Sequence, residues 1–171
     1  RLDVSKLGLS LDPRFVREEI FFNGLLRGLQ TLNFNYDIKD LQNSSLDGLL
    51  KYKQLWVTAT EFMDSDTQKL LSDYVKAGGH LIMYPVIPTL DLYLNSCTIL
   101  RDELKIEFSK SASPNKVNAF GIEDLFTIFK DKQIFEDNNS DVVAITETAE
   151  VCGIRKKIGK GNITAIGFAF G

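Results

Sequence analysis

The chain has 171 residues, of which 20 are Lys or Arg and 23 are Asp or Glu, giving a net charge of −3. This length suits one domain. The near balance of charge offers no electrostatic attraction for nucleic acid or an anionic membrane, and no apolar run approaches the roughly 18 residues of a membrane span. We therefore expect neither nucleic acid nor a membrane as partner. The chain begins at Arg1 without an initiator Met, so we expect a single domain over residues 1–171 that is a fragment of a larger protein.

A strand–helix–strand pattern stands out between residues 54 and 85. Residues 54–59 form a short β-rich apolar run, which predicts a strand buried on both faces. Asp64 or Ser65 is a suitable cap for a helix over residues 64–77, and Ser65 with Gln68 has the spacing of a capping box. Glycine pair 78–79 ends that helix, and residues 80–84 follow as a second buried strand. The pattern predicts a βαβ unit with parallel strands.

A similar alternation precedes this unit. Residues 6–11 predict a first strand, Asp12 caps a predicted helix over residues 13–30, and residues 33–38 alternate apolar and polar as a further strand. The predicted helix has an apolar stripe, which we expect to be buried: Phe15, Val16, Ile20, Phe21, Leu25, Leu26 and Leu29. Repeated βα units favour a doubly wound, mainly parallel α/β sheet of the flavodoxin-like type, with strand order 2-1-3-4 by analogy.

The pattern is weaker after Pro85. A short helix is expected over residues 96–103, a flexible loop over residues 109–118, and strands over residues 120–129 and 141–146. Residues 151–158 and 162–168 flank the turn Gly159-Lys160-Gly161, which predicts a C-terminal β-hairpin rather than a phosphate-binding loop.

Ligands of open parallel sheets bind beyond the carboxyl ends of the strands, here residues 12–13, 37–40, 58–64 and 84–88. None of these turns is a glycine-rich phosphate loop. The turn at residues 84–87 holds no cysteine or serine nucleophile, and His80 opens a strand at the opposite end of the sheet. Cys97 and Cys152 are expected to be separate thiols. We therefore predict no catalytic residue, no cofactor-binding residue and no metal ligand.

Two weaker candidate groups remain. Glu61, Asp64 and Asp91 lie near strand ends, where caps and solvated loop charges are the expected roles. Four aromatic residues could supply a sugar-stacking platform: Tyr52, Trp56, Tyr84 and Tyr93. Because Trp56 and Tyr84 fall within predicted buried strands, core packing is the expected role of these two.

Several segments resemble a domain of bacterial β-galactosidases, the glycoside hydrolases of families thirty-five and forty-two. They are KQLWVTA at residues 53–59, MD at 63–64, LLSDYVKAGGHLI at 70–82, PTLDLY at 88–93, CTIL at 97–100, GKG at 159–161 and AIGF at 165–168. The resemblance implies an amidotransferase-like domain without a nucleophile, beside a catalytic barrel that carries the glutamates.

The function implied by this resemblance is that of a non-catalytic accessory or oligomerisation domain of a β-galactosidase-like hydrolase that cleaves β-linked sugars. Its expected partners are the barrel of the parent chain and a second copy in a homo-oligomer. The contact surface would include residues 15–29 or the loop of residues 85–95. Two alternatives stay open: a free-standing amidotransferase-like enzyme, and a domain that binds a small ligand or a sugar in the strand-end crevice.

Overall fold

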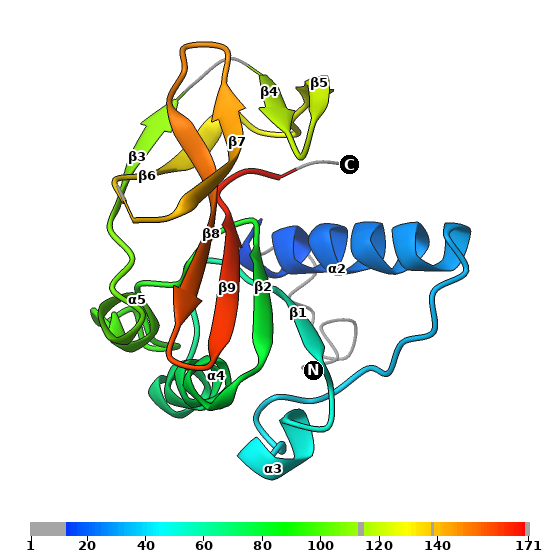
Figure 1. The fold of residues 1–171 in the computed structure, drawn as a ribbon, viewed down its shortest axis with the longest axis vertical. Coiled ribbons are helices and arrows are strands. Elements are labelled where there is room, and N and C mark those ends of the chain that lie inside the picture. Colours follow the sequence, from blue (N-terminus) through cyan, green and yellow to red (C-terminus); the bar gives the residue numbers. More distant parts are fainter. Residues whose placement is uncertain (1–12, 113–114, 138, 170–171) are drawn as a thin grey trace.

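The computed structural model describes residues 13–112, 115–137 and 139–169, with side chains described from Phe21 onward. Its main sheet has seven strands in the order β1-β2-β9-β8-β7-β4-β5, and the sheet is strongly curled (Figure 1). The strands are β1 (Gln54–Thr58), β2 (His80–Tyr84), β4 (Lys116–Ala119), β5 (Ile122–Phe126), β7 (Asp141–Thr146), β8 (Val151–Ile158) and β9 (Gly161–Ile166). A second sheet pairs β3 (Phe108–Ala112) with β6 (Asp131–Phe135). The helices are α2 (Pro13–Thr31), α3 (Leu46–Leu49), α4 (Ser65–Ala77) and α5 (Ile99–Glu103).

The predicted βαβ unit is confirmed. β1 and β2 pair in parallel, with Gln54 opposite His80, and α4 connects them. The Asp64 carboxylate accepts bonds from the Thr67 N–H and hydroxyl, both at 2.8 Å, and so caps α4. At its other end the helix stops at Gly78, whose φ of 126° favours glycine. The capping box is wrong, because the buried Gln68 side chain donates to the Met63 and Cys97 carbonyls instead.

The C-terminal hairpin is also confirmed. β8 and β9 pair antiparallel, and β9 in turn lies parallel to β2. The turn fits tightly against the end of α4: a Cβ at Gly161 would lie 2.2 Å from the carbonyl oxygens of Gly79 and Val75. Gly159 has a φ of 59°, so glycine relieves strain there too. Glycine at positions 159 and 161 therefore lets the hairpin pack closely against the end of α4.

Two hydrophobic clusters cover the sheet. The larger lies between the sheet and the helices α4 and α5 and includes Leu71, Tyr74, Leu81, Met83, Leu100, Ile154 and Ile163. The smaller includes Phe21, Tyr84, Val117, Cys152 and Phe168. Phe21 is the point at which α2 joins this second cluster, through edge-to-face contacts with the rings of Tyr84 and Phe129.

The expected doubly wound, mainly parallel, flavodoxin-like sheet is wrong. Only β1, β2 and β9 run parallel, and β8, β7, β4 and β5 continue the same sheet antiparallel. The reason lies in the connections: from residue 108 on, strands follow one another at short intervals without crossover helices, as antiparallel pairing allows and parallel pairing does not. The sheet is therefore mixed, with one parallel βαβ unit.

Residues 33–38 do not form the predicted strand. Asn33 lies in the turn after α2 with a φ of 56°, residues 34–38 have no regular secondary structure, and the side chains of Phe34 and Ile38 are each 61% exposed. Within the described residues β1 pairs only with β2, so its other edge holds no strand. The expected burial on both faces of β1 is wrong as well, since Trp56 is 41% exposed. An alternating pattern makes a strand only where a neighbouring strand accepts its hydrogen bonds.

The remaining local predictions divide. The loop expected over residues 109–118 is wrong, because β3 and β4 occupy most of it, whereas the strand over 141–146 coincides with β7. β5 covers only residues 122–126 of the expected strand 120–129, since Phe120 and Gly121 turn with positive φ. The short helix predicted over residues 96–103 corresponds to α5, and the long helix predicted over residues 13–30 corresponds to α2. The predicted strand 6–11 and the cap at Asp12 lie outside the described residues.

The second half of α2 and the coil after it form an arm, residues 24–40. Figure 1 shows α2 extending away from the sheet on the side of β1. Leu25, Leu26 and Leu29 are half-buried rather than buried, so the expected buried stripe is not formed along this half of the helix. The arm thus carries apolar side chains that the domain itself does not cover.

Candidate functional site

A cavity of about 360 Å³ lies at the carboxyl ends of the parallel strands. One wall consists of the residues that follow β1, β2 and β9: Ala59, Thr60, Glu61, Pro85, Val86, Phe168 and Ala169. The facing wall comes from the two-stranded sheet, with Lys110, Ser111, Ala112, Asp131, Lys132 and Gln133, and Phe21 and Phe129 complete the lining. The position agrees with the general rule for ligand sites in sheets with parallel strands.

The facing wall contains buried polar side chains held in place by backbone bonds. Gln133 is 2% exposed; its amide donates to the Ile87 carbonyl at 2.9 Å, and its carbonyl accepts from the Ile87 N–H at 2.7 Å. Lys132 is also 2% exposed, and its ammonium donates to the Lys130 carbonyl at 3.2 Å. Gln133 therefore couples β6 to the loop after β2, which fixes the separation of the two walls.

The cavity is lined by two basic residues, two acidic residues and several apolar side chains. Burial lowers the pKa of Lys132, and the negative charges of Asp131 and Glu150 act in the opposite direction. Lys110 is the second basic residue of the lining, and Glu61 and Asp131 are the two acidic ones. Thr60 and Ser111 add hydroxyl groups, of which Ser111 donates to Glu150 at 3.1 Å. Three phenylalanines supply apolar surface: Phe21, Phe129 and Phe168.

Two of the four strand-end turns named from the sequence line this cavity. Residues 59–61 come from the turn after β1 and Pro85 and Val86 from the turn after β2. Residues 37–40 belong instead to the exposed arm, where the Asp37 carboxylate accepts from the Tyr52 hydroxyl at 2.6 Å. Asp12 lies outside the described residues.

The candidate nucleophiles and base are scattered. His80 begins β2 at the opposite end from the cavity, and its Nε2 lies 2.9 Å from the Thr164 hydroxyl. Burial, and then the charge of Arg155, lower its pKa. Cys97 and Cys152 are both free thiols, as expected, and burial raises the pKa of Cys152 to about 12. Among the described residues, no three His, Cys, Asp or Glu side chains are arranged to hold a metal ion.

The other acidic and aromatic candidates have structural contacts. Asp91 accepts from the backbone N–H groups of Tyr93 and Asn95 and so closes the turn of residues 91–95. Tyr84 is buried in the smaller cluster, as expected, whereas Tyr93 is 85% exposed. Trp56 lies exposed on β1 and donates to Gln54 at 3.0 Å. These positions do not bring Tyr52, Trp56, Tyr84 and Tyr93 together as a platform.

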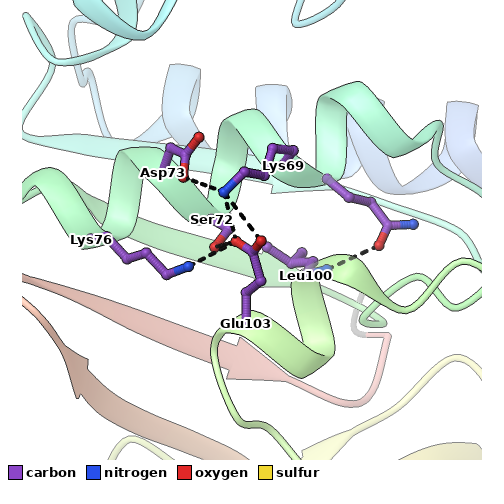
Figure 2. A network of polar contacts seen from close by, with 7 residues as sticks. Lys69, Ser72, Asp73, Lys76, Leu100 and Glu103 are labelled. Atoms are coloured by element: carbon purple, nitrogen blue, oxygen red, sulfur yellow. Dashed lines mark hydrogen bonds and ion pairs between the residues drawn. The ribbon is translucent and has the colours of Figure 1, made fainter.

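A separate polar network joins α4 to α5 (Figure 2). The Glu103 carboxylate accepts from Lys76 at 2.8 Å and from the Ser72 hydroxyl at 2.6 Å, and Lys69 lies 3.1 Å from its other oxygen. These donors hold the pKa of Glu103 at about 2. A neighbouring bond, from the Leu100 N–H to Gln68, ties the start of α5 to the same helix. The donors of this network lie on α4 and their acceptor lies on α5, so we assign it the structural role of holding the two helices together.

Within the described part of the chain, no helix is long and apolar enough to span a membrane.

The mixed sheet with its parallel βαβ unit is similar in fold to part of a solved glycoside hydrolase. It superposes with a TM-score of 0.70 on part of Gan42B, a GH42 β-galactosidase from G. stearothermophilus, at 14% identity over 95% of this chain and 24% of that one. The particular family follows from the sequence: residues 5–142 match the family described as "GLMA-like, second domain", and the chain belongs to it. The resemblance to a glycoside hydrolase domain is thereby confirmed.

Two curated relatives place this domain in larger proteins. The chain is 61% identical over its full length to a "Beta-1,2-glucosyltransferase" of Ignavibacterium album, of which it covers 24%. It is 30% identical over 91% of its length to an "Exo-beta-D-glucosaminidase" of Pyrococcus horikoshii, of which it covers 22%. The chain thus spans about a quarter of the length of these relatives, both of which are named for reactions of sugars.

Half of the cavity was missed by sequence reasoning. Lys110, Ser111, Asp131 and Lys132 lie on β3 and β6, where the sequence predicted a flexible loop or no element at all. Neither strand has a strong apolar alternation, and a buried lysine contradicts the pattern by which core positions are recognised. The sequence offered one signal, the two β-forming residues Ile134 and Phe135 after the charged residues 130–132. Two residues are too few to predict a strand that lines a cavity.

Proposed function

We propose that the chain is a non-catalytic domain of a larger enzyme that acts on β-linked sugars, and that the arm packs against the remainder of that enzyme. The exposed apolar surface of the arm carries this proposal. Leu32, Phe34 and Ile38 are each more than 60% exposed, so three large apolar side chains of the arm lie close together along the chain without cover from the described residues. Further exposed apolar side chains lie on the loop of residues 91–95 and on the strands at the far end of the sheet, among them Tyr93, Ile122 and Phe126.

The occupant of this surface is the rest of the parent protein. The relatives are about four times longer than this chain, so a much larger body of protein accompanies the domain in them. The names of these relatives, a β-1,2-glucosyltransferase and an exo-β-D-glucosaminidase, support an enzyme of β-linked glucose or glucosamine. This widens the expectation of a β-galactosidase to other sugars in β linkage.

The absence of an assembled catalytic group within the described residues supports a non-catalytic role. Cys97 lies outside the strand-end turns, and its backbone N–H donates to Thr89 within a loop. The turn after β2 begins with Pro85 and Val86, neither of which supplies a nucleophile. A free-standing amidotransferase-like enzyme is therefore the weaker of the alternatives.

The arm is tested with the double substitution Phe34→Ser and Ile38→Ser, made both in the 171-residue chain and in the full-length enzyme. In the chain alone the free energy of unfolding should change by less than about 1 kcal/mol, because both side chains are already in water. In the full-length enzyme the melting temperature should fall by several degrees. Equal, small effects in both proteins would contradict the arm as an internal interface.

Catalysis is tested separately on the isolated chain. It should not hydrolyse aryl β-glucosides, aryl β-galactosides or glutamine above the rate of a buffer control. Turnover that disappears on Glu61→Gln or Cys97→Ala substitution would overturn the non-catalytic role. Because this assay does not involve the arm, the two halves of the proposal can fail independently.

A further inference from the structure

The cavity between the strand ends and the β3–β6 sheet is not used by the packing role proposed above. We infer that it is a binding site for a neutral saccharide of one or two sugar units. This inference does not depend on the proposed function, since the site is complete within the described residues of this chain.

Size and position support a ligand site. A volume of about 360 Å³ is at the lower end of the range for pockets that hold small organic molecules, about 300–1,000 Å³. The cavity lies beyond the carboxyl ends of β1, β2 and β9, where ligands of parallel sheets bind. The buried Gln133 amide bonds to both polar atoms of Ile87, so the two walls are held apart before any ligand enters.

The polar groups favour a ligand whose atoms both donate and accept. Glu61 and Asp131 supply acceptor oxygens, Lys110 supplies a donor, the Thr60 hydroxyl can be either, and the Ser111 hydroxyl, which donates to Glu150, can still accept. A sugar hydroxyl donates one bond and accepts others, so a ring of hydroxyls matches such a mixed lining.

The balance of charge argues against an ion. Two basic and two acidic residues line the cavity, so it offers no net field that selects an anion. The Lys132 ammonium, 2% exposed in the wall, repels a cation or a metal ion. A neutral ligand avoids both penalties.

The apolar part of the lining matches the remaining surface of a sugar. The rings of Phe21, Phe129 and Phe168 line the cavity together with Val86 and Ala169. A pyranose presents C–H groups on the faces of its ring and hydroxyls around its edge, so apolar and polar walls in one cavity suit it. The edge-to-face contact of Phe21 with Phe129, at 6.1 Å between ring centres, keeps this apolar surface in place.

The test uses the folded 171-residue chain, with amide chemical shifts followed by NMR during titration. The probes are glucose, a β-1,2-linked glucose disaccharide and, as the ionic alternative, inorganic phosphate. The expected result is saturable shifts with at least one sugar, centred on the amides of Thr60, Glu61, Lys110 and Ser111. Phosphate is expected to give no saturable shift at these amides.

Matched substitutions locate the site. Glu61→Gln and Lys110→Met should each weaken sugar binding about tenfold, the effect of losing one hydrogen bond to a charged group. Glu123→Gln on β5 and Lys157→Met on β8 make the same changes of charge at exposed positions outside the cavity lining and should leave the affinity unchanged. Each variant is first checked for an unchanged melting temperature.

Three results would overturn the inference: no saturable shift with either sugar, sugar binding that both cavity variants leave unchanged, or binding of phosphate without binding of sugar. The last result would assign the cavity to an anion. None of these outcomes bears on the arm, so the proposed function is judged by its own experiment.

Discussion

The βαβ unit and the arm carry similar apolar patterns in the sequence, yet the structure treats them differently. In the unit, Leu71, Tyr74 and Leu81 are fully buried against neighbouring elements. In the arm, Phe34 and Ile38 belong to an alternating apolar pattern and are each 61% exposed. An apolar pattern therefore predicts which side chains favour burial, but it does not predict which element covers them. In the unit the covering elements include α5 and β9, whereas the described residues leave most of the surface of these two arm side chains exposed.

The largest effect is expected from truncating matched leucines in the two regions. Leu71→Ala removes a fully buried side chain from the larger cluster and should lower the free energy of unfolding by about 3 kcal/mol. Leu32→Ala, at a side chain 67% exposed, should change it by less than about 0.5 kcal/mol. Urea denaturation of both variants measures the contrast. Similar losses would mean that the arm is packed in solution.

Matched glycines provide a second contrast, with effects of opposite sign. Gly161→Ala places a Cβ 2.2 Å from two backbone carbonyl oxygens and should destabilise the chain by about 2–3 kcal/mol. Gly24→Ala, in α2, meets nothing within 4 Å and should stabilise it by up to about 1 kcal/mol, because alanine favours the helix. Thermal melts of the two variants test this. A loss of stability from Gly24→Ala would contradict the open surroundings of that helix face.

A third, smaller effect concerns the α4–α5 network of Glu103. Glu103→Gln should cost about 1–2 kcal/mol at neutral pH, because the carboxylate accepts from three donors on α4: Lys69, Ser72 and Lys76. The folded pKa is lowered to about 2, so this contribution is present above the unfolded pKa of about 4.3. It is lost as the pH falls from about 4.5 to about 2.

The pH dependence distinguishes this network from other carboxylates. The difference in stability between the natural chain and Glu103→Gln should shrink through that acidic range, as followed by urea denaturation at several pH values. Glu123→Gln, at an exposed position on β5, is the control and should give no such difference. A constant difference between the natural chain and Glu103→Gln at all pH values would rule out the ionic network as its cause.

The smallest effect is expected at His80, which opens β2. Burial lowers its folded pKa, so the neutral ring is favoured in the folded state, where Nε2 pairs with the Thr164 hydroxyl. Stability from this residue is therefore present above the unfolded pKa of about 6.5 and decreases as the pH falls below it. His80→Gln should remove this small decrease between neutral and mildly acidic pH. An unchanged slope in the variant would assign the decrease to another group.

The candidate site was half predictable. The turns after β1 and β2 follow from a single local βαβ signal, and Glu61 and Val86 lie in them as expected. The opposite wall depends on β3 and β6, two short strands that pair across a separation of about twenty residues along the chain. Lys132 is buried there because of that pairing, and its residue type predicts the reverse.

By itself the sequence determined the features that depend on nearby residues: the Asp64 cap, the stop at Gly78, the parallel unit of β1 and β2, and the hairpin around Gly159. The cap and the two glycine positions depend on a capping bond or a permitted φ within a few residues, and the parallel unit follows from one strand–helix–strand pattern over about 30 residues. Only the tertiary structure decided that β9 lies beside β2, that the sheet continues antiparallel, and that residues 33–38 remain outside it. Strand pairing is a choice among distant partners, and the hydrophobic pattern of one strand fits many of them.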